Sequence, residues 1–320
     1  MKKGKLIALI VAIVLIFAGG ILLVLGLSFA KDRPQDSELL CQEFTIQESF
    51  DAIAIATDDC DAKIAKTSGR DDCMVEIRSF RSVNHTATVE NGTLKIEMID
   101  ERKWSDHIGI FNMFGNVENM EMTVYLPAAE YESLQIRTTT GDIMLAQEPF
   151  FREVMLRTDT GDISCAGDSG DALDCMTSTG DISVQNCAPN MLKLQSNTGD
   201  LQVSTVAGDE IHMTTNTGEV DAENVYALMF TCNTETGDVE LEKVVAEDYL
   251  QIFTDTGGVQ IENSDAGTVN IETNTGDVSG HFLTPKWFSA YSDSGNVTIP
   301  HTREGGECRI QTDTGDIHFR

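Results

Sequence analysis

A short segment, T-x-T-G-D followed by alternating apolar residues, recurs ten times and constrains the fold more than any other feature of the chain. Its glycine never varies, and consecutive glycines are 19 or 20 residues apart. A fixed period of this length predicts a repeat architecture, in which each unit stacks on the next. The ten glycines are Gly141, Gly161, Gly180, Gly199, Gly218, Gly237, Gly257, Gly276, Gly295 and Gly315.

The residues around each glycine predict two strands and a corner. With the glycine as position 0, positions −7, −5, +2 and +4 are apolar in most repeats, and Thr or Asp dominates at −3, −1 and +1. Alternation with a period of two predicts strands with one buried face. We expect a sharp corner at the glycine, where a positive φ would cost other residues steric energy. Thr and Asp can hydrogen-bond the backbone of that corner.

A repeat this short cannot bury its own apolar face, so neighbouring repeats must stack. The sequence therefore predicts an all-β fold, a single-stack β-solenoid of about ten coils. With coils ~4.8 Å apart, the rod would be roughly 50 Å long. We assign residues 131–320 to the regular repeats and residues 44–130 to an irregular β cap at the N-terminal end of the solenoid.

The N-terminal segment predicts a membrane anchor. Residues 6–30 form an uncharged, mostly apolar run, long enough to cross a ~30 Å hydrocarbon core as one helix. Lys2, Lys3 and Lys5 precede it, so residues 1–30 are expected to be a signal anchor with its N-terminus in the cytoplasm. Residues 31–43 would link the anchor to an extracytoplasmic solenoid. A signal peptide cleaved after Ala30 is the alternative, although the apolar run exceeds the usual ~7–15 residues.

The cap carries a degraded repeat. Residues 53–57 match positions −7 to −3, and Cys60 stands where glycine is expected. Further strands are predicted around residues 74–77, 86–89 and 93–98, with a tight hairpin turn at Asn91-Gly92. The apolar stretch from Trp104 to Met122 is interpreted as a plug for the open end of the core. A hydrophobic recognition loop or a second membrane contact is the alternative.

No cap is evident after Gly315. The charged residues of the last segment are expected to protect the final edge, or the edge pairs with a partner. They are Arg303, Glu304, Glu307, Arg309 and Arg320.

The cysteines fall mostly in inward columns, where cysteine behaves as a small apolar residue. Spacing leaves two pairs able to form disulfides, Cys60 with Cys73 and Cys165 with Cys187. There is no C-x-x-C motif and no clustered Cys/His set, so a structural zinc site is not expected.

The charge balance limits the partners. The chain has 52 acidic and 22 basic residues, and the part beyond residue 33 has a net charge of −34. Such a domain repels nucleic acid, so no nucleic-acid partner is expected. Acidic residues recur at position +1, where they would form a ladder along the rod. The ladder comprises Asp142, Asp162, Asp181, Asp200, Glu219, Asp238, Asp277 and Asp316.

Stacked carboxylates can attract calcium, and these aspartates are the metal-site candidates. The preferred interpretation is that each caps the amides of its own corner, with no cofactor and no metal bound. Catalytic motifs such as H-E-x-x-H, G-x-S-x-G and Walker sequences are absent. Intervals of at most 20 residues after Gly141 leave no room for loops that build a catalytic cleft. A non-enzymatic role is therefore predicted.

The T-x-T-G-D-I/V cores, such as residues 158–163, resemble the bacterial putative-adhesin family of β-strand-repeat proteins, domain of unknown function 4097. Residues 53–64 and Tyr125-Leu126-Pro127 add to the resemblance, which covers residues 44–320. It implies an adhesin-like scaffold or binding protein of the cell envelope, linked to envelope stress. The expected partners are the lipid bilayer, through the N-terminal helix, and envelope proteins or polysaccharide. An envelope polysaccharide-acting enzyme on the solenoid face is the alternative.

Overall fold

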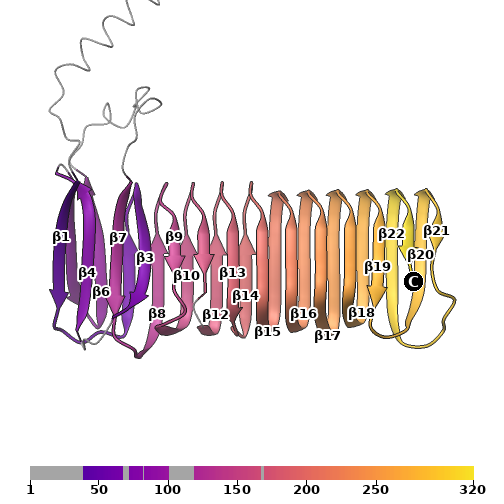
Figure 1. Cartoon of the computed structure of the whole chain (residues 1–320), viewed down its shortest axis with the longest axis horizontal. Helices are drawn as coiled ribbons and strands as arrows, with labels where there is room; N and C mark the ends of the chain where they lie inside the picture. The colour runs from indigo at the N-terminus through magenta and orange to yellow at the C-terminus, as the bar shows by residue number, and fades with distance from the viewer. Residues whose placement is uncertain (1–38, 68–71, 82, 101–118, 167–168) are drawn as a thin grey trace, which may run out of the picture.

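The structure, a computed structural model, describes residues 39–67, 72–81, 83–100, 119–166 and 169–320. These residues form one continuous β-structure wound into a solenoid of about nine turns, with no helix in the described ranges (Figure 1). Within these ranges, nothing helical is long and apolar enough to cross a membrane. The expected anchor, residues 1–30, and most of the linker lie outside the described residues, as does most of the apolar stretch from Trp104.

The first ten strands build the N-terminal end and the earliest coils: β1 (Leu39–Ile46), β2 (Ala52–Ala56), β3 (Cys60–Lys66), β4 (Cys73–Phe80), β5 (Val83–Glu90), β6 (Thr93–Asp100), β7 (Met120–Leu126), β8 (Glu130–Arg137), β9 (Ile143–Leu145) and β10 (Phe150–Arg157). The remaining strands continue the rod: β11 (Ile163–Cys165), β12 (Ser169–Met176), β13 (Ile182–Cys187), β14 (Met191–Gln195), β15 (Leu201–Thr217), β16 (Val220–Thr236), β17 (Val239–Thr256), β18 (Val259–Thr275), β19 (Val278–Phe282), β20 (Lys286–Ser294), β21 (Val297–Thr298), β22 (Gly306–Thr314) and β23 (Ile317–Phe319).

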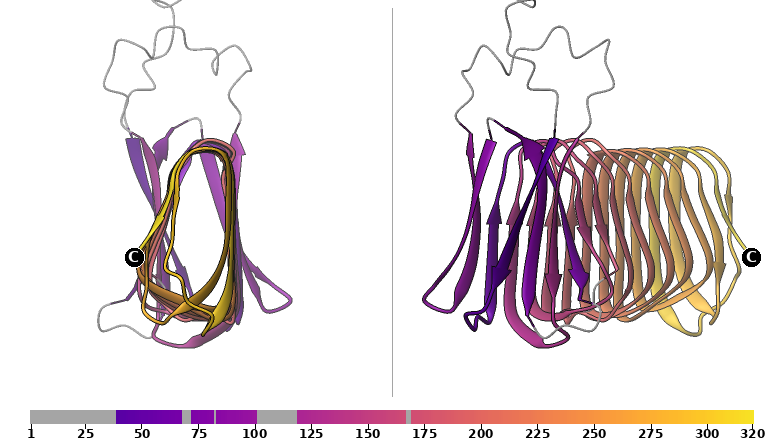
Figure 2. Two further views of the ribbon diagram at one scale, coloured as in Figure 1. Left: turned by 90° about the vertical axis from the view of Figure 1, so that its right-hand side faces the viewer. Right: turned by 60° about the vertical axis from the view of Figure 1, so that its left-hand side comes forward.

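Neighbouring coils pair in parallel and in the register that the repeat predicts. Val220 of β16 lies between Leu201 of β15 and Val239 of β17, so position +2 forms one column. Side chains of the apolar columns are buried. Viewed along the rod, the coils form a narrow, elongated ring (Figure 2). The predicted all-β solenoid is confirmed.

The corner glycines are required for a reason other than the expected one. Positive φ values, 146° to 159°, occur at Gly180, Gly199, Gly218, Gly237 and Gly315, and not at the other five. What all ten share is close backbone packing. A Cβ at any of them would come closer than 3.0 Å to a carbonyl oxygen of the adjacent coil. The glycine is therefore needed mainly because the coils approach each other too closely for a side chain.

The side-chain hydroxyl at position −3 donates a hydrogen bond to the same glycine carbonyl of the adjacent coil. Thr215 is buried, and its Oγ1 donates to the Gly199 oxygen at 3.0 Å. Thr158, Thr177, Thr234 and the equivalent residues of later coils repeat this bond. Each corner is thus tied to its neighbour by a buried side-chain hydrogen bond, which accounts for the preference for Thr or Ser at this position.

A second bend, which the sequence analysis did not identify, lies at position +6. Five residues there have φ between 52° and 57°, in the left-handed region that few non-glycine residues adopt. They are Asn186, Thr205, Asn224, Lys243 and Asn263. Three of the five are Asn, the residue type that tolerates this conformation best after glycine.

At the N-terminal end, the strands of the degraded repeat form the first coil of the stack. Ile53 pairs with Leu134, and Ala62 pairs with Ile143, so β2 and β3 continue the regular columns. On their other side lie β6 and β7, in parallel. The hairpin turn at Asn91-Gly92 joins β5 antiparallel to β6, and β4 lies antiparallel to β7. Antiparallel strands therefore cover this end of the parallel stack.

At the C-terminal end the coils do not follow sequence order. The last repeat, β22 and β23, lies between the coil of Gly276 and the coil of Gly295. The outermost coil is consequently formed by β20 and β21 (Figure 1). The expected final edge just past Gly315 is wrong, because β23 is inserted into the stack.

The eight cysteines are thiols in this structure, seven of them buried and Cys41 exposed. Neither candidate pair forms a disulfide. Burial raises the pKa of Cys60 and of Cys73 to about 12. These thiols therefore act as small apolar side chains of the core.

Candidate binding surface on the acidic flank

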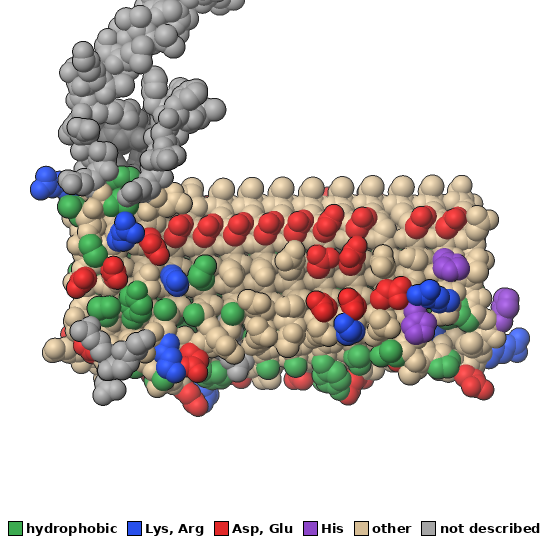
Figure 3. Space-filling model, in the orientation of Figure 1, with side chains coloured by type: hydrophobic (Ala, Val, Ile, Leu, Met, Phe, Trp, Pro, Cys, Tyr) green, Lys and Arg blue, Asp and Glu red, His purple; other side chains and the backbone are tan. Residues whose placement is uncertain are grey.

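The +1 carboxylates form the expected ladder, visible as a straight row of acidic side chains along the rod (Figure 3). Each aspartate of the ladder accepts a hydrogen bond from a backbone N–H of the neighbouring coil and not, as expected, from its own corner. The Asp162 N–H donates to Asp142 Oδ1 at 2.8 Å, and the Asp181 N–H donates to Asp162 Oδ1 at 2.8 Å. The same bond links Asp200, Asp238, Asp277 and Asp316 to the coil that follows each in the stack.

The ladder carboxylates therefore hold consecutive coils together. Among the described residues, no group of three or more His, Cys, Asp or Glu side chains is arranged to hold a metal ion.

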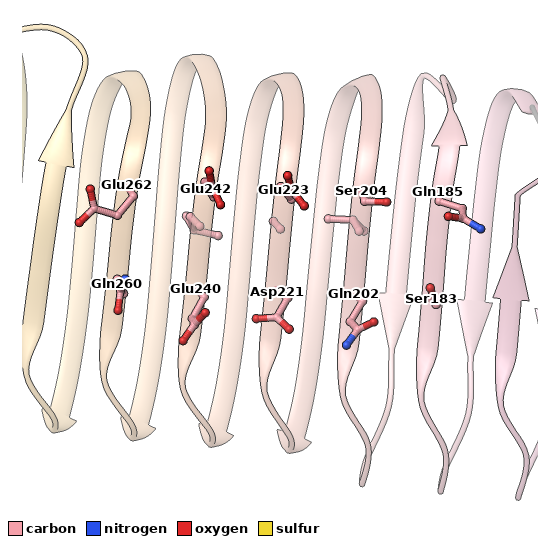
Figure 4. A pocket seen from close by; sticks show the side chains of 13 residues that line it. Ser183, Gln185, Gln202, Ser204, Asp221, Glu223, Glu240, Glu242, Gln260 and Glu262 are labelled. Atoms are coloured by element: carbon pink, nitrogen blue, oxygen red, sulfur yellow. The ribbon is translucent and has the colours of Figure 1, made fainter.

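Beside the ladder, the side chains at positions +3 and +5 point outward from the strand that follows each glycine. These two rows line a shallow depression of about 460 Å³ on β13 and β15–β18 (Figure 4). Carboxylates occupy the middle of it: Asp221 and Glu223 on one coil, and Glu240 and Glu242 on the next. Gln202 and Ser204 lie on one side of them, and Gln260 and Glu262 lie on the other. We call this surface, with Glu219 and Asp238 of the ladder, the acidic flank.

The carboxylates of the acidic flank repel one another. The charge of Asp200 is the main cause that raises the pKa of Glu219, and Asp221 and Asp238 add to it. Partial burial is the main cause that raises the pKa of Asp221, and the charge of Glu240 raises it further. A cationic partner would relieve this repulsion.

Two basic side chains already border the flank. Lys243 Nζ lies 2.6 Å from Glu242 Oε1 and 3.8 Å from Glu223 Oε1. Arg320 lies 3.8 Å from Glu262. Lys243, Glu223 and Glu242 are about half exposed, and Arg320 is more exposed still. These pairs therefore contribute little to stability and leave the surface open to exchange of partners.

Sequence reasoning found the ladder but missed the rows beside it. The signal was present in the spacing, because Asp221 and Glu240 are 19 residues apart, as are Glu223 and Glu242. The residues at these positions form one surface only when the coils stack in register. The result is a flat sheet of carboxylates, amides and hydroxyls, which suits repeated polar contacts with an extended partner. The enzymatic alternative is not supported.

Across the described coils of β13 and β15–β18, polar side chains form straight rows on an uninterrupted face, which places the protein in the class of solenoid repeat scaffolds. The chain belongs to the Toastrack DUF4097 family, whose model matches residues 50–244 and 218–320. This confirms the family resemblance seen in the repeat. No curated protein matches the sequence.

Several solved structures are similar to this chain. A putative adhesin from Bacteroides fragilis is 14% identical, with 88% of this chain and 97% of that chain covered and a TM-score of 0.41. A putative lipid binding protein from Parabacteroides distasonis is 15% identical over 76% of this chain and 97% of that chain, with a TM-score of 0.46. A putative adhesin from the same organism is 10% identical over 88% and 98%, with a TM-score of 0.45.

Proposed function

We propose that this protein is a non-catalytic, adhesin-like binding protein of the cell envelope. Residues 1–30 hold it in the cell membrane, and the solenoid stands outside the cytoplasm. The observation that carries the proposal is the acidic flank, an open row of carboxylates on a face without loop insertions. Such a face offers many equivalent polar contacts but encloses no substrate.

The charge of the flank favours one kind of partner. Carboxylates at positions +1, +3 and +5 of two adjacent coils attract cationic groups and repel anionic lipid headgroups and nucleic acid. Basic segments of envelope proteins, or envelope polysaccharide with amino groups, have the matching chemistry. A role in the response to envelope stress would follow if the occupancy of this face changed with the state of the envelope.

Capture from an envelope extract tests the binding proposal. The wild-type chain is compared with a flank variant, Asp221→Asn, Glu223→Gln, Glu240→Gln and Glu242→Gln. A control variant, Asp209→Asn, Glu235→Gln, Asp248→Asn and Glu272→Gln, removes the same charge from exposed sites elsewhere. We expect a partner captured by the wild type and the control and lost with the flank variant. Equal capture by all three proteins would refute the proposal.

The membrane placement has its own test. Protease added to intact protoplasts should digest the solenoid and leave a small membrane-bound fragment. Protection of the solenoid until lysis would contradict the proposed orientation. Release of an intact soluble domain without protease would indicate cleavage after Ala30 instead of a retained anchor.

A further inference from the structure

The two ends of the solenoid differ in whether further strands cover the terminal coil. At the N-terminal end, β4 and β5 lie antiparallel along the outer edges of β7 and β6. At the C-terminal end, β22 is the one described strand that pairs with β20, and β23 is the one that pairs with β21. Residues 169–320 are all described, and none of their strands lies along the outer edge of β20.

The outer coil at this end exposes apolar side chains. Trp287 is 59% exposed, Tyr291 58% and Val297 40%. The inward residues Phe288 and Ala290 are only partly buried, although their column is fully buried in the coils beneath. A long edge strand with exposed apolar side chains is a template for pairing with another strand.

Of the two edges, β20 is the one suited to pairing. It has nine residues, and Lys286 at its start is buried. The Lys286 ammonium bonds to the Asp265 carboxylate and to the Ala266 oxygen, which fixes the strand on the stack. By contrast, β21 has two residues and is followed closely by Pro300, which cannot donate a backbone hydrogen bond.

The charge distribution indicates which partner can approach. Residues 281–320 contain five acidic and four basic residues, with three of the six histidines. The chain as a whole has a net charge of −30. Two copies would repel each other along their flanks, whereas their C-terminal ends are close to neutral. This end is therefore where a second copy meets the least repulsion.

We propose that β20 pairs antiparallel with β20 of a second copy, around a two-fold axis at Ser289. This register places Trp287 opposite the partner's Tyr291 on the outer face, twice by symmetry. It also places Phe288 opposite the partner's Ala290, so the partly buried core of one rod continues into the other. The antiparallel contact of β4 with β7 shows that a strand of this stack accepts an antiparallel neighbour. This pairing does not depend on the proposed function of the acidic flank.

Cross-linking of the full chain in detergent tests the axis. In a Cys41→Ser background, Ser289→Cys places two thiols directly opposite each other at the axis, within the range that a disulfide bridges. Ser178→Cys is the matched control, an exposed serine in the middle of the rod. Under mild oxidation we expect a disulfide-linked dimer for Ser289→Cys and none for Ser178→Cys. Equal dimer yields from the two variants, or no dimer from either, would overturn the proposal. Larger oligomers without a Ser289→Cys dimer would also overturn it, because they indicate head-to-tail contact.

Charge substitutions in the Ser289→Cys protein test the register. Trp287→Lys with Tyr291→Lys sets like charges opposite each other and removes the aromatic pairs. We expect the rate of cross-linking to fall at least about tenfold. Trp287→Lys with Tyr291→Glu sets opposite charges across the axis, and we expect most of the rate to return. Because both side chains are exposed, melting temperatures should stay close to that of the parent. Equal cross-linking by the two double variants would show that the register is wrong.

Discussion

Close contact between backbones decides the residue at each corner of this solenoid. A comparison of Gly257 with Gly258 distinguishes close backbone contact from a positive φ as the reason for glycine. Gly257 has no positive φ, yet a Cβ there would meet the Gly237 carbonyl closer than 3.0 Å. At Gly258 the nearest atom to a Cβ would be the Asp277 oxygen, at 3.4 Å.

We therefore predict that Gly257→Ala destabilises the protein by roughly 3 kcal/mol, because the overpacked coils must separate. Gly258→Ala should cost less than about 1 kcal/mol. Thermal or denaturant melts measure both. A mild effect of Gly257→Ala would mean that close packing is not what selects glycine at the corner.

The left-handed bend at position +6 provides a second prediction at the residue scale. Thr205 has φ 56°, a conformation that a β-branched residue adopts only with strain. Thr205→Asn should stabilise the protein by about 1 kcal/mol, because Asn tolerates this region. The reverse change, Asn224→Thr, should destabilise it by a similar amount. Shifts in melting temperature of the same sign for the two variants would contradict this account.

At the scale of elements, the buried ion pair of the terminal coil is the main feature. Lys286 of β20 is 3% exposed, and its ammonium also lies 3.0 Å from Thr284 Oγ1 and 5.7 Å from the centre of the Phe282 ring. Its carboxylate partner, Asp265, belongs to β18, two coils away. The pair thus ties the outermost coil to the stack beneath the inserted β22.

Removing this lysine leaves a buried carboxylate without its cation. We predict that Lys286→Ala destabilises the protein by about 3–5 kcal/mol. Amides of β20 and β21 should exchange with solvent much faster, whereas those of β15 and β16 should keep their protection. Lys193→Ala, at an exposed lysine, is the control and should change stability by less than about 0.5 kcal/mol. Uniform loss of protection along the rod would show that Lys286 does not act locally.

At the scale of the whole molecule, the rod carries a high density of like charge along one flank. Any cation screens this repulsion, with a Debye length of ~8 Å at physiological ionic strength. The ladder carboxylates are already engaged by backbone N–H groups of adjacent coils. The expected effect of divalent cations is therefore general screening.

We predict that calcium and magnesium, at equal low millimolar concentration and constant ionic strength, raise the melting temperature slightly and equally. A designed calcium site would respond distinctly more to calcium. The control is the variant Asp162→Asn, Asp181→Asn and Asp200→Asn, which keeps an acceptor oxygen at each position. A large calcium-specific shift that this variant abolishes would establish the ladder as a metal site.

Much of this architecture could be predicted from the sequence, because the repeat encodes local properties. The period, the inward columns, the corner at Gly218 and its equivalents, the Asn91-Gly92 hairpin and the ladder from Asp142 to Asp316 all follow from short-range patterns. Each depends on residues within one repeat, or on the same position in the next.

The tertiary structure decided what the repeat leaves open. Every coil has the same apolar pattern, so this pattern allows each coil to stack on any other. The order of the coils at the C-terminal end therefore cannot be deduced from the repeat. Contacts outside the repeat, such as that of Lys286 with Asp265, hold the outermost coil in this order. The flank of Asp221 and Glu240 likewise exists only because stacking brings residues 19 positions apart onto adjacent strands of one face.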